Sequence, residues 1–200
     1  MIDFIIARHG MTEPNTRGVC LGRSDVPLIP QGYEQAMRLA ERMKDIKADA
    51  VFTSPLLRAS DTAKCYMRAA RLDIPLTEDP RLEERDWGDW EGVSFADVAR
   101  DRPEEYAQFY GDIYNFTVPG GECSVNVQAR VNELIDYIIS EYDGKTVCLF
   151  THLGTARHII SRLLGLAPEE SWRFFLDTAT YARIEYDTAA GNGLLKGLSN

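Results

Sequence analysis

The chain has 200 residues, of which 44% are hydrophobic and 26% are charged. This length and composition are those of one ordinary globular domain with enough chain to bury a core. The formal net charge of −9 argues against nucleic acid and against an anionic membrane surface as the main partner. It does not argue against a small anionic substrate, because a local group of arginines can bind phosphate within an acidic protein.

The apolar stretches, the N-terminus and the cysteines together point to the cytoplasm. No apolar stretch approaches the roughly 18 residues needed to span a bilayer, and the chain begins as a strand that carries Asp3, without a basic leader segment. The four cysteines are scattered without a C-x-x-C pair, which favours reduced thiols over a disulfide framework. We therefore expect a cytoplasmic protein with no membrane span.

The first part of the chain predicts two strands, two helices and one long loop. A strand at about residues 2–8 precedes a loop over residues 11–30, and loops of that length without regular structure are usually functional. A helix is predicted over residues 31–47, because its apolar residues recur at helical spacing. A second strand at residues 49–52 leads to Ser54-Pro55, which is typical of an N-cap followed by proline at the first helical position.

The second part begins with an acidic, aromatic segment over residues 81–121, in which Pro103 opens a second short helix. We expect this segment to form a small lobe over the sheet edge and the active site. Because strands and helices alternate, the sequence predicts a single domain, residues 1–200, with a three-layer α/β/α sandwich and a mainly parallel sheet with an antiparallel edge. The remaining predicted elements are a helix at 124–142, a strand at 146–150, a helix ending near 164–165, and a hairpin of 181–186 with 194–198 that turns at 191–193.

Cationic side chains follow three of the predicted strands at the points where the strands end. Arg8-His9 follows the first strand, Arg58 follows the second, and His152 follows the strand at residues 146–150. In an open α/β sheet, ligands bind outside the carboxyl ends of the parallel strands. Two arginines and two histidines are therefore expected in one crevice, and this set of charges predicts a phosphate site.

These four side chains suit the chemistry of phosphoryl transfer. His9 is the candidate nucleophile, because a neutral imidazole nitrogen can attack phosphorus and form a phosphohistidine that water later cleaves. Its other nitrogen should then donate to a fixed acceptor, such as a nearby backbone carbonyl. Arg8 and Arg58 are expected to bind the remaining phosphate oxygens, since a guanidinium fork matches two of them and stays charged. His152, cationic when phosphate is bound, would add a further donor in the transition state.

The leaving alkoxide needs a proton, and the segment at residues 82–92 offers carboxylates among tryptophans. Glu83 and Glu84 are both candidates for a group that acts first as an acid and then as a base. By composition alone, the segment also fits an acidic loop that two tryptophans anchor. Spacing does not choose between the two glutamates.

Five separate motifs follow one another along almost the whole chain. They are R-H-G at 8–10 with Thr12 and Asn15, G-R-S-D-V-P-L at 22–28, T-S-P-L-L-R-A-S-D-T-A at 53–63, the segment at 82–92, and G-G-E at 120–122 with T-H at 151–152. This series resembles the histidine phosphatase superfamily, also called the phosphoglycerate mutase-like family. The resemblance implies a phosphoglycerate mutase-like fold, with His9 as nucleophile and with Arg8, Arg58 and His152 around the phosphoryl group.

The same resemblance adds further roles. It places the acid/base carboxylate on Glu84, and it implies no metal and no organic cofactor. Two positions depart from the family pattern: Met11 stands where many members have Glu, and Leu153 replaces a small residue after the second histidine. For the phosphate contacts, the family pattern adds Asn15, Gly22 and Leu153.

Three functions are weighed. The first is a metal-independent phosphatase for a small phosphorylated metabolite, with α-ribazole 5′-phosphate as the first candidate, because the interval from Glu84 to Gly120 lacks the long insertion of the glycolytic mutases. The second is a cofactor-dependent phosphoglycerate mutase, and the third is a non-catalytic module that binds phosphorylated ligands. A metal site on His9, His152 and His158 is disfavoured, because the latter two do not share a helical face, and His158 is expected at the surface or in packing. A homodimer is left open.

Overall fold

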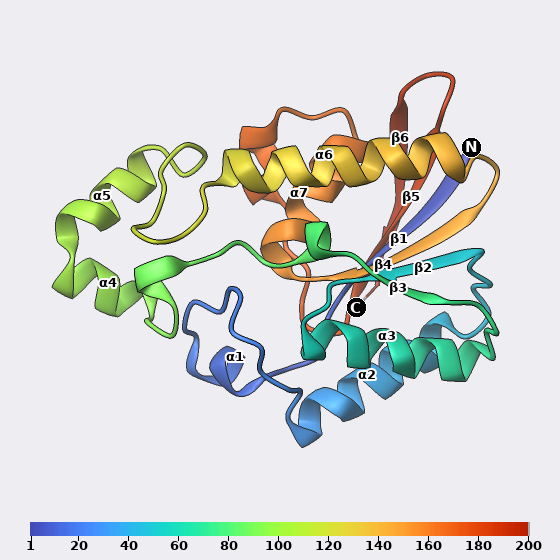
Figure 1. The fold of residues 1–200 in the computed structure, drawn as a ribbon, viewed down its shortest axis with the longest axis horizontal. Helices are drawn as coiled ribbons and strands as arrows, with labels where there is room; N and C mark the ends of the chain where they lie inside the picture. Colours follow the sequence, from blue (N-terminus) through green and yellow to red (C-terminus); the bar gives the residue numbers. More distant parts are fainter. Residues whose placement is uncertain (200) are drawn as a thin grey trace.

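The computed structural model, which describes residues 1–199, places six strands in one sheet (Figure 1). The strand order across the sheet is β3-β2-β4-β1-β5-β6. The first four strands pair in parallel, whereas β5 pairs antiparallel with β1 and with β6. The predicted mainly parallel sheet with an antiparallel edge is thus confirmed. The bounds are β1 Ile2–Arg8, β2 Ala50–Thr53, β3 Leu76–Glu78, β4 Thr146–Thr151, β5 Tyr181–Asp187 and β6 Asn192–Leu198.

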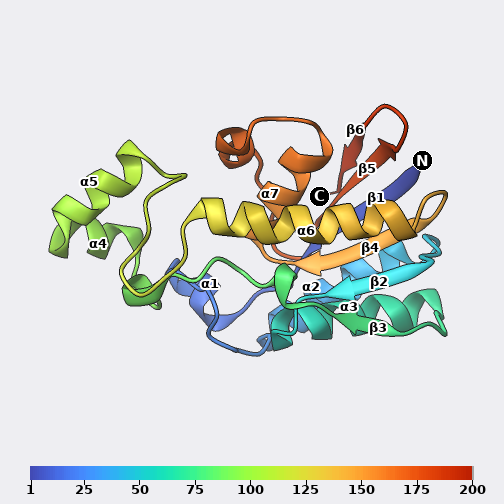
Figure 2. The ribbon, with the colours of Figure 1, turned by 45° about the horizontal axis from the view of Figure 1, so that its top comes forward.

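Helices cover both faces of the sheet and make the fold a three-layer α/β/α sandwich. One face is covered by α2 and α3, and the other by α6 and α7 (Figure 2). These four helices are α2 Pro30–Met43, α3 Leu57–Ala70, α6 Ser124–Glu141 and α7 Leu153–Leu163. The shorter helices are α1 Glu13–Arg17, α4 Phe95–Asp101 and α5 Pro103–Gly111, with the 3₁₀ helices η1 Pro80–Leu82, η2 Gly88–Trp90 and η3 Pro168–Arg173.

The side chains of β1 show why the sheet needs helices on both faces. Phe4 and Ile6 are buried in the cluster that includes α6 and α7, whereas Ile5 and Ala7 are buried in the cluster with α2 and α3. Successive residues of a strand point to opposite faces, so a strand that is apolar throughout is stable only between two layers. Each fully buried Ile or Phe side chain contributes roughly 1.5–3 kcal/mol. The buried residues of β1 hold its carboxyl end in place, and the candidate site begins at that end.

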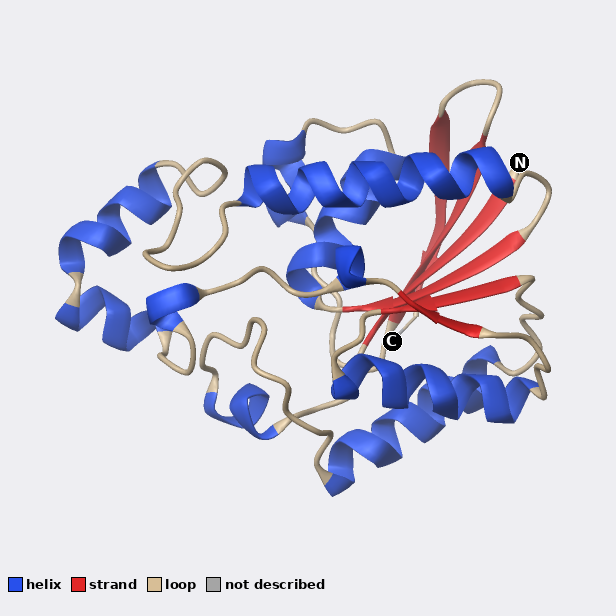
Figure 3. Cartoon of the chain, in the orientation of Figure 1, coloured by secondary structure: helices blue, strands red, loops and turns tan. Residues whose placement is uncertain are grey.

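The segment between β3 and α6 forms a lobe with a small core of its own. Helices α4 and α5 project beyond the sheet, on the side to which β4 runs (Figures 2 and 3). Trp90, Val98 and Phe109 are buried within this lobe, where aromatic rings contact one another edge to face. Helices α4 and α5 thus extend past the strands, and the position of the lobe over the active site stays a prediction. Their aromatic residues bury one another instead of covering the strands.

Several predicted boundaries differ from the structure: the helix predicted over residues 31–47, for example, ends at Met43. For two of the differences, hydrogen bonds show the cause. The loop predicted over residues 11–30 contains α1, whose start is stabilised by Asn15 Oδ1, which accepts the Thr12 N–H at 3.0 Å. Helix α3 begins at Leu57 and not after Ser54, and Asp25 Oδ1 accepts the Leu57 N–H at 2.7 Å. A carboxylate from a distant loop thus satisfies a helix N-terminus that local sequence leaves open. The sequence patterns also do not predict β3 and η3.

Within residues 1–199, no helix combines the length and the apolar character needed to cross a bilayer. The same residues contain no group of three or more His, Cys, Asp or Glu side chains placed to bind a metal ion. Asn200, the last residue of the predicted domain, lies outside the described residues.

Candidate active site

The structure brings the two predicted histidines together at the carboxyl ends of β1 and β4. These strands are neighbours, and Arg8 pairs in register with Thr151, so His9 and His152 leave the sheet side by side. Their ring centroids are 5.0 Å apart. His9 is 3% exposed and His152 is fully buried, so protein atoms surround both rings.

The His9 ring is held in the tautomer that a nucleophile needs. Its Nδ1 lies 2.6 Å from the carbonyl oxygen of Gly10, which can only accept, so Nδ1 carries the proton and Nε2 keeps its lone pair. The predicted hydrogen bond to a backbone carbonyl is confirmed. Burial, together with the positive charges of Arg58 and Arg8, lowers the pKa of His9 well below its usual value. The imidazole is therefore neutral at neutral pH.

His152 is held between Arg58 and Ser54. Arg58 Nε donates to His152 Nδ1 at 3.2 Å, so the ring proton is on Nε2, which lies 2.8 Å from Ser54 Oγ. Burial and the charge of Arg58 lower the pKa of His152 well below its usual value. A cationic His152, as expected with bound phosphate, would lose the hydrogen bond from Arg58, because an imidazolium has no lone pair. The structure therefore favours a neutral ring that donates through Nε2.

Arg58 also connects the loop before α2 to the site. Its Nη1 donates to the Ser24 carbonyl at 2.8 Å and its Nη2 to the Gly22 carbonyl at 2.6 Å. Burial lowers the pKa of Arg58 to about 10, which is still far above neutrality, so the group stays cationic. Glu91 accepts the Gly22 N–H at 2.9 Å. The backbone N–H and C=O of Gly22 thus both form hydrogen bonds within the protein, which hold the loop in place. Gly22 does not line the described pocket, so the structure does not place it as the phosphate contact that the sequence predicts.

Arg8 presents an unused donor to the pocket. Its Nη1 donates to the Leu176 carbonyl at 2.7 Å, which fixes the guanidinium. Its Nε is buried and has no hydrogen-bond partner among residues 1–199. An unsatisfied buried donor costs about 1–3 kcal/mol, and a phosphate oxygen would supply the acceptor. Asn15 lines the same pocket, and its Oδ1 accepts from Thr12, which leaves the amide nitrogen for a ligand.

Glu84 lines the pocket, and backbone donors fix its carboxylate. Its Oε2 accepts the Gly154 N–H at 2.9 Å, and its Oε1 accepts the N–H groups of Arg85 at 2.9 Å and Thr155 at 3.2 Å. Gly154 and Thr155 belong to the first turn of α7, directly after His152. The Glu83 carboxylate instead forms an ion pair with a half-exposed arginine outside the pocket. The geometry therefore favours Glu84, the choice that the family pattern implies.

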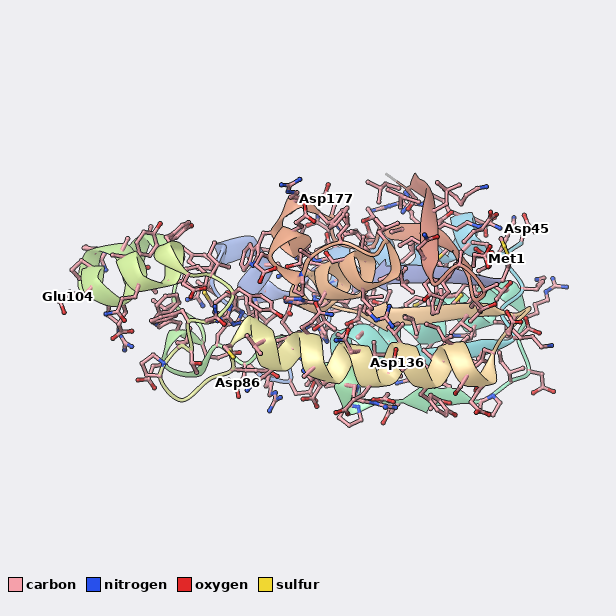
Figure 4. All side chains as sticks on the ribbon, turned by 90° about the horizontal axis from the view of Figure 1, so that it is seen from above. Met1, Asp45, Asp86, Glu104, Asp136 and Asp177 are labelled. Atoms are coloured by element: carbon pink, nitrogen blue, oxygen red, sulfur yellow. The ribbon has the colours of Figure 1, made fainter. Side chains whose placement is uncertain are left out.

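One pocket of about 170 Å³ connects these groups. Figure 4 shows Asp86 beside the start of α6 and Glu104 at the tip of the lobe, so Arg85 and Trp87 of the lining lie at the base of the lobe. Arg58 and His152 are fully buried and lie outside the lining. Of the lining residues, the sequence predicts Arg8, His9, Asn15, Glu84 and Leu153.

The sequence does not predict several polar residues of the lining. His158, expected at the surface or in packing, is buried in the pocket wall, with Nδ1 2.9 Å from Gln128 Oε1. The sequence did contain a signal for Arg157. It follows the predicted site residue Leu153 by four positions, so the two side chains lie on the same face of the helix. No local signal marks the others. The missed polar and aromatic residues are Arg85, Trp87, Phe95, Ser124, Arg157, His158, Ser171 and Trp172.

A neutral buried imidazole beside arginines and a carboxylate, at the strand ends of an α/β/α sandwich, is typical of phosphoryl-transfer proteins that work through a histidine. The sequence comparison agrees with this class. The chain belongs to the histidine phosphatase superfamily, whose branch 1 matches residues 4–196.

The chain is also similar to individual proteins of known sequence or structure. It is 33% identical over 183 residues to a bifunctional protein of Mycobacterium tuberculosis. The matched region covers 91% of this chain but only 50% of the length of that relative. It is 33% identical over 169 residues to a 2,3-bisphosphoglycerate-dependent phosphoglycerate mutase of Rhizobium etli, covering 80% of this chain and 78% of the mutase. The crystal structure of the α-ribazole phosphatase from Shigella flexneri matches with a TM-score of 0.88 at 28% identity, over 99% of this chain and 96% of that chain.

Proposed function

We propose that this chain hydrolyses a small-molecule phosphomonoester through a phosphohistidine at His9, without a metal ion. The geometry of His9 and Arg8 carries the proposal. The hydrogen bond to Gly10 leaves a lone pair on His9 Nε2. Arg8 lines the same pocket, and its buried Nε has no acceptor among residues 1–199. A phosphoryl group meets both needs, because its phosphorus is an electrophile and its oxygens accept hydrogen bonds from a guanidinium.

In the first half of the reaction, His9 Nε2 attacks phosphorus, so that the N–P bond forms and the ester P–O bond breaks. Arg8 binds the phosphate oxygens, while Arg58 supplies a second positive charge behind the two imidazoles. His152 stays neutral between Arg58 and Ser54, and its ring lies beside that of His9. Glu84, in its acid form, gives its proton to the leaving alkoxide, and an alcohol departs.

In the second half, water attacks the phosphohistidine and Glu84 takes a proton from it. The new O–P bond forms, and the N–P bond breaks with its electron pair returning to His9 Nε2. Inorganic phosphate leaves, and Glu84 is again in its acid form. One ester and one water thus give one alcohol and one phosphate, with the protein unchanged.

α-Ribazole 5′-phosphate is the particular substrate that we propose to test first. The aromatic rings of Trp87, Phe95 and Trp172 line the pocket, and they suit a leaving group that contains a ring. The structural similarity to the Shigella flexneri α-ribazole phosphatase supports the same choice.

Phosphoglycerate mutation is the alternative, favoured by the similarity to the Rhizobium etli mutase. A mutase needs priming by 2,3-bisphosphoglycerate and interconverts phosphoglycerates without releasing phosphate. The interval from Glu84 to Gly120 carries the short helices η2, α4 and α5 and no long insertion, which favours hydrolysis over retention of a phosphorylated intermediate. A purely binding module is disfavoured, because no residue of the candidate machinery is missing.

The test is a screen of phosphorylated metabolites that measures released inorganic phosphate, with and without EDTA and vanadate. We expect release that EDTA leaves unchanged and that vanadate inhibits, because vanadate mimics the pentacoordinate state. Rapid quenching with labelled substrate should trap an acid-labile N–P adduct on His9. Loss of turnover with EDTA, or an adduct on another residue, would contradict the proposal.

A further inference from the structure

The pocket holds a second set of polar groups, which the proposed reaction does not use. Arg157 of α7 is partly buried there. Its Nε donates to the Phe174 carbonyl at 2.6 Å, and its guanidinium carbon lies 4.7 Å from the centroid of the Trp172 ring. These contacts fix the side chain, but within residues 1–199 neither Nη group forms a hydrogen bond or an ion pair. Glu84 is the acidic side chain whose charge acts on this guanidinium.

Ser171 provides a second, independent observation. It belongs to η3, next to Trp172, and it lines the same pocket. The residue is fully buried, and its Oγ has no hydrogen-bond partner among the described residues. A buried hydroxyl in this state is unfavourable by about 1–3 kcal/mol. A ligand atom that accepts a hydrogen bond would remove this cost.

The charges of the lining indicate what kind of ligand fits. Glu84 is the single acidic residue among the described lining residues, whereas three arginines are present. Arg85 is already committed, because its three nitrogens donate to the Glu122 carbonyl, to Ser124 Oγ and to the Phe116 carbonyl. Besides Arg8, this leaves Arg157 as the lining arginine with unused donors. The pocket therefore favours a ligand with a second negative charge.

Arg8 and Arg157 line the same pocket, so one small molecule can reach both side chains. The pocket of about 170 Å³ limits the second group to a small one. A carboxylate fits, because its two oxygens match the fork of two Nη groups, and Ser171 can donate a further hydrogen bond.

We propose that Arg157 and Ser171 bind a carboxylate on the alcohol part of the substrate. This inference rests on the proposed phosphatase reaction but not on α-ribazole 5′-phosphate as its substrate. It predicts phosphomonoesters whose leaving alcohol carries a carboxylate. α-Ribazole 5′-phosphate has no carboxylate and would leave this pair unused, which makes it a discriminating substrate.

Two pairs of substrates that differ in the carboxylate test the inference. O-phosphoserine differs from phosphoethanolamine by one carboxylate, and 3-phosphoglycerate has a carboxylate where glycerol 3-phosphate has a hydroxymethyl group. We measure kcat and KM for all four, with p-nitrophenyl phosphate and α-ribazole 5′-phosphate as uncharged leaving groups. In the wild-type protein, kcat/KM should be roughly tenfold or more higher for the carboxylate member of each pair, on the scale of a charge-assisted hydrogen bond.

Variants separate recognition from folding. Arg157→Gln should lower the ratio of kcat/KM within each pair by roughly 10- to 100-fold, chiefly through KM. Because Arg157 also contacts Phe174 and Trp172, Arg157→Lys and Ser171→Ala are included: the first keeps the charge, and the second removes only an unpartnered hydroxyl. Ser171→Ala should lower the ratio by roughly two- to tenfold. Arg162→Gln is the control, since Arg162 lies on the same helix but pairs with Asp136 at the surface, and it should leave the ratio unchanged.

The outcomes distinguish the two proposals. Hydrolysis without a preference for the carboxylate member, or equal losses on both members in Arg157→Gln and Ser171→Ala, would refute the carboxylate subsite and leave the phosphatase function standing. A clear preference for α-ribazole 5′-phosphate would do the same. No phosphate release from any of the six compounds would refute both.

Discussion

The inner end of the site, where the buried Arg58 and His152 support the lining residues Arg8 and His9, differs in construction from the outer wall of the pocket. The outer wall is formed by Arg157, Ser171 and Trp172. The inner residues lie at or just beyond the ends of β1, β2 and β4, and His9, Arg58 and His152 are almost completely buried. The outer residues come from the second turn of α7 and from η3. The inner end is suited to fixed chemistry, whereas the outer wall is suited to choosing the substrate.

Hydrogen bonding shows the same contrast. At the inner end, the two imidazoles have defined tautomers, because Gly10 and Arg58 each contact one ring nitrogen. At the outer wall, Ser171 Oγ and the Nη groups of Arg157 have no partner within residues 1–199. A site whose groups are already oriented needs little reorganisation during reaction. A wall with unused donors gains most from the ligand that it binds.

The largest effect is expected at the inner end. His9→Ala should lower kcat for p-nitrophenyl phosphate by about 1,000-fold or more, the scale seen when a covalent nucleophile is removed. The fold should survive, because the change removes a side chain at a strand end and not in the apolar core; a thermal melt checks this. Turnover above a few per cent of wild type would contradict the nucleophile role.

Glu84→Gln should have the next largest effect, and it should depend on the leaving group. An alkyl phosphate needs a proton on its leaving oxygen, so its hydrolysis should slow by roughly 10²- to 10⁴-fold. p-Nitrophenolate needs little protonation, so the loss should be much smaller. Steady-state rates for both substrates test this, and equal losses would argue against Glu84 as the acid.

Gly154→Ala tests the positioning of the same carboxylate without removing it. A Cβ at residue 154 would overlap Glu84 Oε1, so the carboxylate must move. We expect a loss of about tenfold for alkyl phosphates, smaller than that of Glu84→Gln. Alanine is favoured over glycine inside a helix by about 1 kcal/mol, so the melting temperature should not fall in parallel. A parallel loss of stability would indicate general disruption instead.

The smallest effect concerns stability and not catalysis. Burial, together with the charges of Arg130, Arg85 and Arg157, lowers the pKa of His158 to about 3. Between pH 6.5 and 3, the unfolded chain therefore binds a proton at residue 158 that the folded chain does not. This lowers the free energy of unfolding by about 1.4 kcal/mol for each pH unit of acidification.

In His158→Gln, the unfolded chain can no longer bind a proton at residue 158. The free energy of unfolding of this variant, measured with urea at pH 6.5 and 5.5, should fall less than that of the wild type by about 1 kcal/mol, because the unfolded wild-type chain is already half protonated at residue 158 at pH 6.5. His9 and His152 titrate in both proteins and cancel from the difference. Identical pH dependence would mean that His158 is not buried as described.

Some features of this protein follow from local sequence. The apolar run of β1 predicts a strand buried on both faces, and the alternation of strands with helices predicts a mainly parallel sheet. The helix predicted over residues 124–142 is confirmed as α6, and its Val127, Val131 and Leu134 are fully buried at helical spacing. Because parallel strands end at one edge, the convergence of His9 and His152 also follows from sequence.

Other features required the tertiary structure. Gly22 lies in a motif that predicts a phosphate contact, yet Glu91 and Arg58 use its backbone groups. The start of α3 depends on Asp25, which lies 32 residues earlier in the chain. Ser171 and Arg157 carry no pattern that predicts a shared wall. These outcomes depend on which distant segments come together, and short-range periodicity contains no information about such contacts.

The sequence by itself determined the layers of the fold and the residue types at its strand ends, because burial and strand direction repeat at short spacing. The tertiary structure alone decided which of those groups stay free for a ligand. A donor is free or occupied according to its neighbours in space, and for Arg8, Arg58 and Arg157 those neighbours include residues more than a dozen positions away along the chain.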